Sequence, residues 1–307
     1  MSGYDAVMLV AFGGPDSMDE VRPFLRRVLA GRPVPEERFE QVAHHYEVIG
    51  GKSPLVEITR KQAASLQATL RVAGLDLEVS VGMRHSAPFL SDALRAARDK
   101  GARRVLCVIM AAHESPASHG RYRESVEHAL RELGTHAPAV GYSAGFHDHP
   151  GFIAANVEHV RAAQASSPAA RDGLLVFTAH SIPTAVAERS PYVAELRESA
   201  ALVAAELRAP RHLLAYQSRS GSPREPWLEP DVSRVIEEQA ALGTRALLLC
   251  PVGFVCDHVE VLYDLDVEAA QTAARAHVAV ARAQAVNDHP AFIAALCERV
   301  QQACRSH

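Results

Sequence analysis

The sequence predicts an α/β protein in which parallel sheets are flanked by helices and form two similar domains. Three observations support this fold class. Apolar runs of strand length alternate with stretches of helical periodicity, the runs are continuous in Val, Leu, Ile and Ala, and two short motifs occur twice. Continuous apolar runs are typical of strands covered on both faces, as the strands of parallel sheets are. We therefore expect helices on both sides of each sheet.

The predicted strands and helices follow one another along the whole chain. Apolar runs with the length of buried strands lie at residues 5–12, 77–83, 105–112, 138–143, 174–180, 212–217, 246–252 and 277–282. Helical periodicity predicts helices at residues 18–30, 36–47, 54–73, 88–100, 120–134, 150–165, 192–208, 230–242, 258–275 and 290–304. A helix between two strands returns the chain to the same end of the sheet, so this order favours parallel pairing.

Two motifs recur in the same order at nearly the same offset. Residues 148–155 read DHPGFIAA and residues 288–295 read DHPAFIAA, and each segment opens a predicted helix. Upstream of them, GARRVL at 101–106 resembles GTRALL at 243–248, each just before a core strand. Such a repetition predicts two related halves.

From this repeat we predict a first domain at residues 1–147, with the C-terminal helix 288–307 as an optional completion, and a second domain at 148–287. Ligands of open parallel sheets bind outside the carboxyl ends of the strands. Two such domains facing each other would form an active-site cleft between those ends.

Composition excludes several classes of function. The net charge of -4, without a dense block of Lys and Arg, argues against nucleic-acid binding. No apolar run approaches the roughly 18 residues of a membrane span, and the first residues lack the basic flank of a signal peptide. The five cysteines are odd in number and widely spaced, which favours reduced thiols in a cytoplasmic protein.

Histidines follow several predicted strands at their carboxyl ends. His85, His113 and His180 each stand at such an end, and a segment rich in acidic residues, 251–268, follows the seventh strand. Loops at this edge have no packing reason to prefer imidazole, so we expect a functional site there. A structural hydrogen bond remains the alternative for any one of these histidines.

Glu260, Asp264 and Glu268 are spaced four residues apart and would form one row on the predicted helix 258–275. A row of carboxylates suits a hydrated divalent metal, and a solvated acidic helix face is the alternative. The chain lacks the phosphate-loop, dinucleotide, nucleophile-elbow, HExxH and CxxC patterns. Nucleotide binding, serine hydrolysis and a zinc site of these kinds are therefore not predicted.

Six segments together resemble the ferrochelatase family, whose members insert ferrous iron into a porphyrin. They are LVAFGGP at 9–15, GGKSPL at 50–55, GMRH at 82–85, TAHSIP at 178–183, YQSR at 216–219 and the segment 251–268. They span nearly the whole chain in the family's order. The resemblance implies two Rossmann-like domains with the porphyrin in the cleft between them. It places the catalytic histidine at His180 and the catalytic glutamate at Glu260, with no cofactor beyond the substrate Fe(II).

Insertion of iron requires removal of water from Fe(II), distortion of the macrocycle and loss of two pyrrole N–H protons. An imidazole and a carboxylate can each ligate the metal or accept a proton, and the sequence leaves open which does which. We expect His180 and Glu260 to contact the metal. Asp264 and Glu268 would extend this metal path, or a proton path, toward solvent.

The segment HESPASHGRY at 113–122 resembles the form of the family found in Gram-positive bacteria, a soluble monomer that converts coproporphyrin III to coprohaem. This implies that Ser53 and Tyr122 bind propionates and that His85 lines the cleft near the metal. Phe12, also expected at the substrate, departs from that form, which usually has tyrosine there. The alternatives are a protoporphyrin IX ferrochelatase, a cobalt or nickel chelatase of the same fold, and a non-catalytic tetrapyrrole or metal carrier.

Some family members carry an iron–sulfur cluster, which needs four cysteine ligands brought together. Cys297 and Cys304 lie seven residues apart in the C-terminal helix, whereas Cys107 and Cys250 lie in predicted core strands. We therefore predict no cluster.

Overall fold

The computed structural model describes residues 3–31, 34–167, 171–221 and 224–306. The chain divides into two compact units. Unit 1 contains Met1–Met110, His119–Gly145 and Ile293–His307, and unit 2 contains Ala111–Ser118 and Phe146–Phe292. The domain ranges 1–147 and 148–287 remain a prediction from the sequence.

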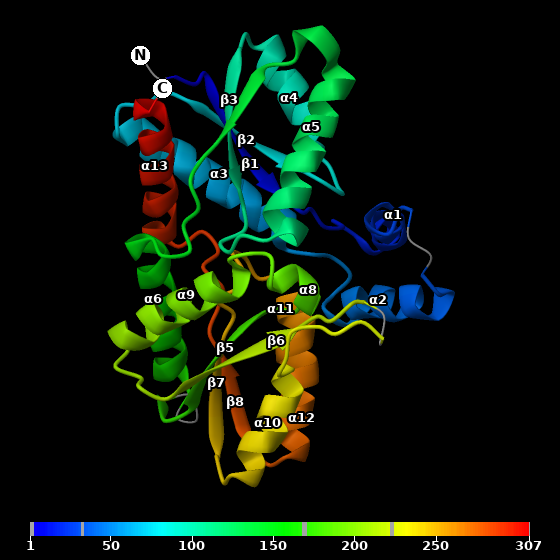
Figure 1. The fold of residues 1–307 in the computed structure, drawn as a ribbon, viewed down its shortest axis with the longest axis vertical. Helices are drawn as coiled ribbons and strands as arrows, with labels where there is room; N and C mark the ends of the chain where they lie inside the picture. Colours follow the sequence, from blue (N-terminus) through cyan, green and yellow to red (C-terminus); the bar gives the residue numbers. More distant parts are fainter. Residues whose placement is uncertain (1–2, 32–33, 168–170, 222–223, 307) are drawn as a thin grey trace. The chain divides into compact units, whose positions relative to one another are not determined.

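Unit 1 is built on a four-stranded parallel sheet with the strand order β2-β1-β3-β4. The strands are β1 (Ala6–Ala11), β2 (Glu78–Met83), β3 (Arg104–Ile109) and β4 (Ala139–Tyr142). All six residues of β1 are buried, which explains its uninterrupted apolar sequence. The helices are α1 (Met18–Val28), α2 (Glu36–Val48), α3 (Leu55–Val72), α4 (Leu90–Asp99) and α5 (Arg121–Leu133). Helices α3 and α4 both pack against β1 and β2 (Figure 1).

Unit 2 is built on a second four-stranded parallel sheet with the order β6-β5-β7-β8. Its strands are β5 (Leu174–His180), β6 (His212–Gln217), β7 (Ala246–Cys250) and β8 (Ala279–Arg282). Its helices are α6 (Pro150–Ser166), α8 (Thr184–Ala187), α9 (Tyr192–Glu206), α10 (Val232–Ala241), α11 (Val259–Tyr263) and α12 (Ala270–Arg275). The last helix, α13 (Pro290–Arg305), begins in unit 2 and ends in unit 1. One side of the sheet is covered by α10, α11 and α12, whose apolar residues join the core around Val176 and Leu249 (Figure 1).

The two sheets share one topology, because in each unit the first strand is central and is flanked by the second and the third. The repeated sequence motifs form the same helix start in both places. The Nδ1 atom of His149 accepts a hydrogen bond from the N–H of Gly151 at 3.2 Å, and Nδ1 of His289 accepts one from Ala291 at 3.2 Å. Each histidine thus satisfies one backbone donor of the helix that follows.

The predicted α/β fold with parallel sheets is confirmed, and every predicted strand and helix position is occupied. One helix prediction is wrong in its interior. The helix expected at 258–275 is α11, then a π-helical turn at Asp264–Ala269, then α12. An apolar pattern does not distinguish a turn with i→i+5 bonds from an α-helical one. Short elements at Pro116–Gly120, a π-helical turn, and at Thr184–Ala187 were not predicted.

Within the described ranges, the helices are all too short or too polar to cross a membrane.

Candidate active site

His180 and Glu260 lie side by side in unit 2. His180 is the last residue of β5, and Glu260 lies in the first turn of α11. The Nε2 atom of His180 is 3.3 Å from Oε1 of Glu260. Their side chains are 29% and 40% exposed, so a ligand from solvent can reach the pair.

Two contacts hold His180 in this orientation. Its Nδ1 atom donates a hydrogen bond to the carbonyl oxygen of Ser181, since a carbonyl can only accept. The neutral imidazole therefore carries its proton on Nδ1 and presents Nε2 to Glu260. The hydroxyl of Tyr192, a buried residue at the start of α9, donates to the carbonyl oxygen of His180 at 2.9 Å. One contact thus orients the imidazole ring, and the other fixes the backbone of His180 at the end of β5.

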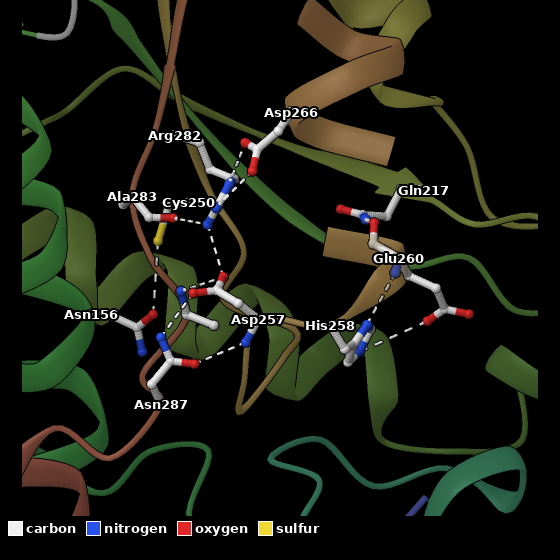
Figure 2. Close-up of polar contacts among 11 residues, drawn as sticks. Asn156, Gln217, Cys250, Asp257, His258, Glu260, Asp266, Arg282, Ala283 and Asn287 are labelled. Atoms are coloured by element: carbon white, nitrogen blue, oxygen red, sulfur yellow. Dashed lines mark hydrogen bonds and ion pairs between the residues drawn. The ribbon is translucent and has the colours of Figure 1, made fainter. Parts of the chain in front are cut away.

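The peptide groups of Glu260 are held on both sides. His258, the N-cap of α11, accepts the N–H of Glu260 on its Nδ1 atom at 3.2 Å. The side-chain amide of Gln217 donates to the carbonyl oxygen of Glu260 at 2.6 Å. Gln217 ends β6 and pairs with His180 in the sheet register. Figure 2 shows Gln217 and His258 on either side of the backbone of Glu260.

A charged network anchors the loop that leads into α11 (Figure 2). The carboxylate of Asp257 accepts hydrogen bonds from Arg282 at 2.8 Å, the N–H of Ala285 at 3.3 Å and the amide of Asn287 at 2.8 Å. Arg282 also donates two hydrogen bonds to Asp266, at 2.6 and 2.8 Å. The side chains of Asp257 and Arg282 are only 12% and 13% exposed. The network joins the loop before α11 to β8 and to the π-helical turn.

The same loop approaches β5 closely. A Cβ atom at Gly253 would lie 2.5 Å from the Cβ atom of Ala179, so a larger residue would push the loop away from the strand that ends in His180.

In the His180–Glu260 pair, each residue stabilises the charged form of the other. Burial disfavours a charged imidazole, but the Glu260 carboxylate and the Ser181 carbonyl outweigh it and raise the pKa of His180 to about 9. Burial likewise disfavours the charged carboxylate, but His180 and His258 lower the pKa of Glu260 to about 2. Burial lowers the pKa of His258 below its usual value. Near neutral pH the pair is therefore an imidazolium next to a carboxylate.

Asp264 and Glu268 continue from Glu260 along the π-helical turn, with different environments. Asp264 is 8% exposed and accepts a hydrogen bond from the hydroxyl of Ser218. Burial raises the pKa of Asp264 to about 7, in spite of that hydrogen bond and with the added repulsion of Glu260 and Glu268. Glu268 is exposed. The row thus contains an exposed, a buried and a half-exposed carboxyl group. Ser218 keeps a left-handed backbone (φ 62°) that is uncommon outside glycine.

The expected substrate residues Phe12, His85 and Tyr122 lie in one cluster of unit 1. The ring centroids of Phe12 and His85 are 4.7 Å apart. The guanidinium of Arg84 lies 5.8 Å from the centroid of Phe12 and 5.2 Å from that of Tyr122, which joins the three rings. Arg84 lies in the segment GMRH at 82–85, but the sequence did not predict a role for it at the site.

Ser53, the fourth expected substrate residue, is also in unit 1 but stands against the loop after β1. Its N–H donates to the carbonyl oxygen of Pro15 at 2.9 Å. A Cβ atom at Gly14 would lie 2.6 Å from the Cβ atom of Ser53, so glycine allows this close approach.

Sequence reasoning missed the residues that hold the pair. Gln217 lies in YQSR at 216–219 and His258 in the segment 251–268, but no role followed from their residue types alone, and nothing in the sequence points to Tyr192. His113, one of the three histidines at strand ends, is 2% exposed and shares a hydrogen bond of 2.9 Å with Ser199. The structural alternative therefore fits His113 better than a ligand-binding role.

All five cysteines are buried single thiols. Cys107 lies in β3 of unit 1 and Cys250 in β7 of unit 2, and burial raises the pKa of each to about 12. Cys297 and Cys304 lie in α13. The absence of an iron–sulfur cluster remains a prediction.

Known proteins resemble the chain over nearly its whole length. The family model described as Ferrochelatase matches residues 4–304. A ferrochelatase of Rhodopirellula baltica is 42% identical over 301 residues, which cover 97% of this chain and 86% of that protein. A coproporphyrin III ferrochelatase of Streptomyces griseus is 41% identical over 313 residues, covering 95% and 84%. One of Propionibacterium freudenreichii is 41% identical over 311 residues, covering 98% and 87%.

Solved structures with the same fold include SirB from Bacillus subtilis with Fe3+, at a TM-score of 0.60 and 12% identity, covering 97% of this chain and 95% of that one. CbiX, described as the terminal enzyme of sirohaem biosynthesis in denitrifying bacteria, has a TM-score of 0.55 and 16% identity, covering 97% and 99%. At these identities the likeness concerns the fold.

Proposed function

Because the chain belongs to the ferrochelatase family, we propose that it inserts Fe(II) into coproporphyrin III to give coprohaem, in haem biosynthesis. The observation that carries the proposal is the His180–Glu260 pair, with Nε2 and Oε1 3.3 Å apart at the end of a central strand. Several relatives about 40% identical are named coproporphyrin III ferrochelatase, which supports this porphyrin. Protoporphyrin IX is the alternative substrate.

The pair can provide a ligand for the metal, Glu260, and an acceptor for pyrrole protons, His180. At neutral pH, Glu260 is an anion and His180 is its counter-cation. Fe(II) arriving at the Glu260 carboxylate replaces that cation and repels the proton on Nε2. His180 then loses its proton to solvent, and the neutral Nε2 can accept one pyrrole proton, release it to solvent and accept the second. Two protons leave the porphyrin for each Fe(II) that enters, so the charge of the macrocycle is unchanged.

Asp264 and Glu268 form the proposed path to Glu260. The exposed Glu268 can receive hydrated Fe(II), and oxygen ligands hold such an ion loosely enough to pass it on. Buried Asp264, with a pKa of about 7, can change protonation state near neutral pH, which suits a site that takes up and releases cations.

Phe12, Ser53, His85 and Tyr122 are the proposed porphyrin-binding residues. The rings of Phe12, His85 and Tyr122, joined by Arg84, offer an aromatic surface for the macrocycle, and Arg84 adds a positive charge that suits a propionate. Hydroxyl groups on Ser53 and Tyr122 can donate to propionate oxygens.

The test is an anaerobic metallation assay with Fe(II) and either coproporphyrin III or protoporphyrin IX. We expect faster turnover of coproporphyrin III. The variants His180→Ala and Glu260→Ala should each lose nearly all activity. The surface pair His128 and Glu132, with Nε2 and Oε1 also 3.3 Å apart, provides matched controls, because alanine there removes the same groups from exposed positions of α5.

Each other outcome has a distinct meaning. Faster turnover of protoporphyrin IX would keep the family and replace the substrate. Tight porphyrin binding without turnover of either would indicate a carrier, and full activity in His180→Ala or Glu260→Ala would contradict the roles of the pair.

A further inference from the structure

Gln217 connects the backbones of the two proposed catalytic residues. It is the last residue of β6 and the parallel partner of His180 in β5. Its own carbonyl oxygen accepts the N–H of Ser181, next to His180, at 2.8 Å. Its side chain reaches the opposite partner, because the amide nitrogen donates to the carbonyl oxygen of Glu260 at 2.6 Å.

That second contact determines which way the carboxamide points. A carbonyl oxygen can only accept, so the Gln217 atom facing Glu260 must be the NH2 group. The remaining atom, Oε1, is buried, and no donor in the described part of the chain reaches it. Gln217 as a whole is 1% exposed.

A buried acceptor without a partner weakens the fold. Leaving Oε1 unpaired costs its full desolvation, and an apolar side chain of the same shape would remove that cost while giving up the one bond to Glu260. The unpaired Oε1 thus offsets what the bond to Glu260 adds to stability, so stability alone does not account for a carboxamide at position 217.

The contact acts where α11 needs support. This helix has five residues and runs directly into the π-helical turn, so the pattern of its backbone hydrogen bonds changes within one turn of Glu260. His258 holds the N–H of Glu260 and Gln217 holds its carbonyl (Figure 2). Without Gln217, the carbonyl side of Glu260 loses its link to the strand beside His180.

We propose that Gln217 is a positioning residue for metal insertion, whose amide keeps Glu260 in reach of Nε2 of His180 at a cost to the stability of unit 2. This inference rests on the proposed function of the pair. It predicts opposite effects on activity and on stability from one substitution.

The test variant is Gln217→Met, which keeps the length and volume but removes the donor and the unpaired acceptor. We expect kcat for metallation to fall on the order of ten- to a hundredfold, as for small displacements of reacting groups. KM for the porphyrin should stay within about twofold, because the change alters positioning and not uniform binding. The melting temperature should be unchanged or higher.

Thr178→Val is the matched control. Thr178 lies two residues before His180 on the same strand face, and its Oγ1 atom is also buried without a partner in the described residues. The change likewise removes an unpaired buried acceptor but touches no contact of Glu260. We expect wild-type kcat and an unchanged or higher melting temperature.

A kcat of Gln217→Met within about twofold of wild type, or a lower melting temperature with unchanged kcat, would overturn the proposal. Gln217→Leu serves as a second variant if the methionine variant does not fold. Crystal structures of the wild type and the variant test the proposal independently of activity. An unchanged distance between His180 and Glu260 in the variant would also overturn it. An inactive wild-type enzyme would instead refute the proposed function.

Discussion

The substitution Glu260→Gln should abolish most of the increase in the pKa of His180. The carboxylate, 3.3 Å from Nε2, is the main influence that raises the pKa of His180 from 6.5 to about 9 against the effect of burial. Glutamine keeps the size but not the charge. We expect His180 to titrate near or below 6.5 in the variant, so that it is mostly neutral at pH 7 instead of almost fully protonated.

The magnitude follows from the same numbers. A rise from 6.5 to about 9 corresponds to about 3 kcal/mol at ~1.36 kcal/mol per pKa unit. The side chains are 29% and 40% exposed, so solvent screening reduces the expected contribution to stability to about 1–2 kcal/mol. The raised pKa of His180 and the lowered pKa of Glu260 describe the same ion pair, so its contribution to stability is counted once.

The pH dependence has a definite sign. Because the pKa of His180 is raised in the folded state, its contribution is complete below pH 6.5 and is lost as the pH rises through about 9. The pKa of Glu260 is lowered, so its contribution is present above pH 4.5 and is lost as the pH falls through about 2. The difference in unfolding free energy between wild type and Glu260→Gln should be largest between pH 4.5 and 6.5.

The assay is an NMR titration of the imidazole of His180, assigned by comparison with His180→Ala, together with urea unfolding at pH 6 and pH 10. If His180 in Glu260→Gln still titrated near pH 9, the carboxylate would not be the cause of the shift. An equal stability difference at pH 6 and pH 10 would refute the linkage.

Three further substitutions test the surroundings. Arg282→Met leaves the buried carboxylate of Asp257 without its cation and should destabilise the protein by about 3–5 kcal/mol in urea unfolding, whereas a loss below about 1 kcal/mol would show that the network is not coupled to folding. Tyr192→Phe removes the hydroxyl that donates to the carbonyl oxygen of His180 and should lower the free energy of unfolding by about 1 kcal/mol. We also expect a lower kcat and an unchanged KM for the porphyrin, whereas a raised KM alone would place Tyr192 at the substrate. Phe12→Tyr adds a phenol oxygen and should change the ratio of Fe(II) to Zn(II) insertion rates, and an unchanged ratio would place position 12 away from the metal.

The fold was readable from the sequence because its strands are buried on both faces. Residues of β1 are all buried, and the same holds for the middle of β5, so apolar runs mark these strands directly. The repeated Asp-His-Pro motif also predicted the two halves, and the structure shows that each copy caps a helix in the same way. The interior of the helix at 258–275 differed, because a π-helical turn leaves no distinct apolar pattern, and the short elements at Pro116–Gly120 and Thr184–Ala187 were not predicted.

The candidate active site was only partly predictable from the sequence. Strand-end positions and the family resemblance point to His180 and Glu260, which lie close together although eighty residues (260 − 180) separate them in sequence. The contacts of Gln217, Tyr192 and Arg282 depend on side-chain geometry between elements that are distant in sequence. Residue type and spacing carry no information on such geometry.

The buried thiols make each sheet accessible to a chemical reporter. Cys107 lies in β3 of unit 1 and Cys250 in β7 of unit 2, and burial raises the pKa of each to about 12. A neutral, enclosed thiol does not react with alkylating reagents, because only the exposed thiolate is a nucleophile. In variants whose only cysteine is Cys107 or Cys250, the rate of alkylation therefore measures how often the sheet of that unit opens. The two units can in this way be compared separately in the intact protein.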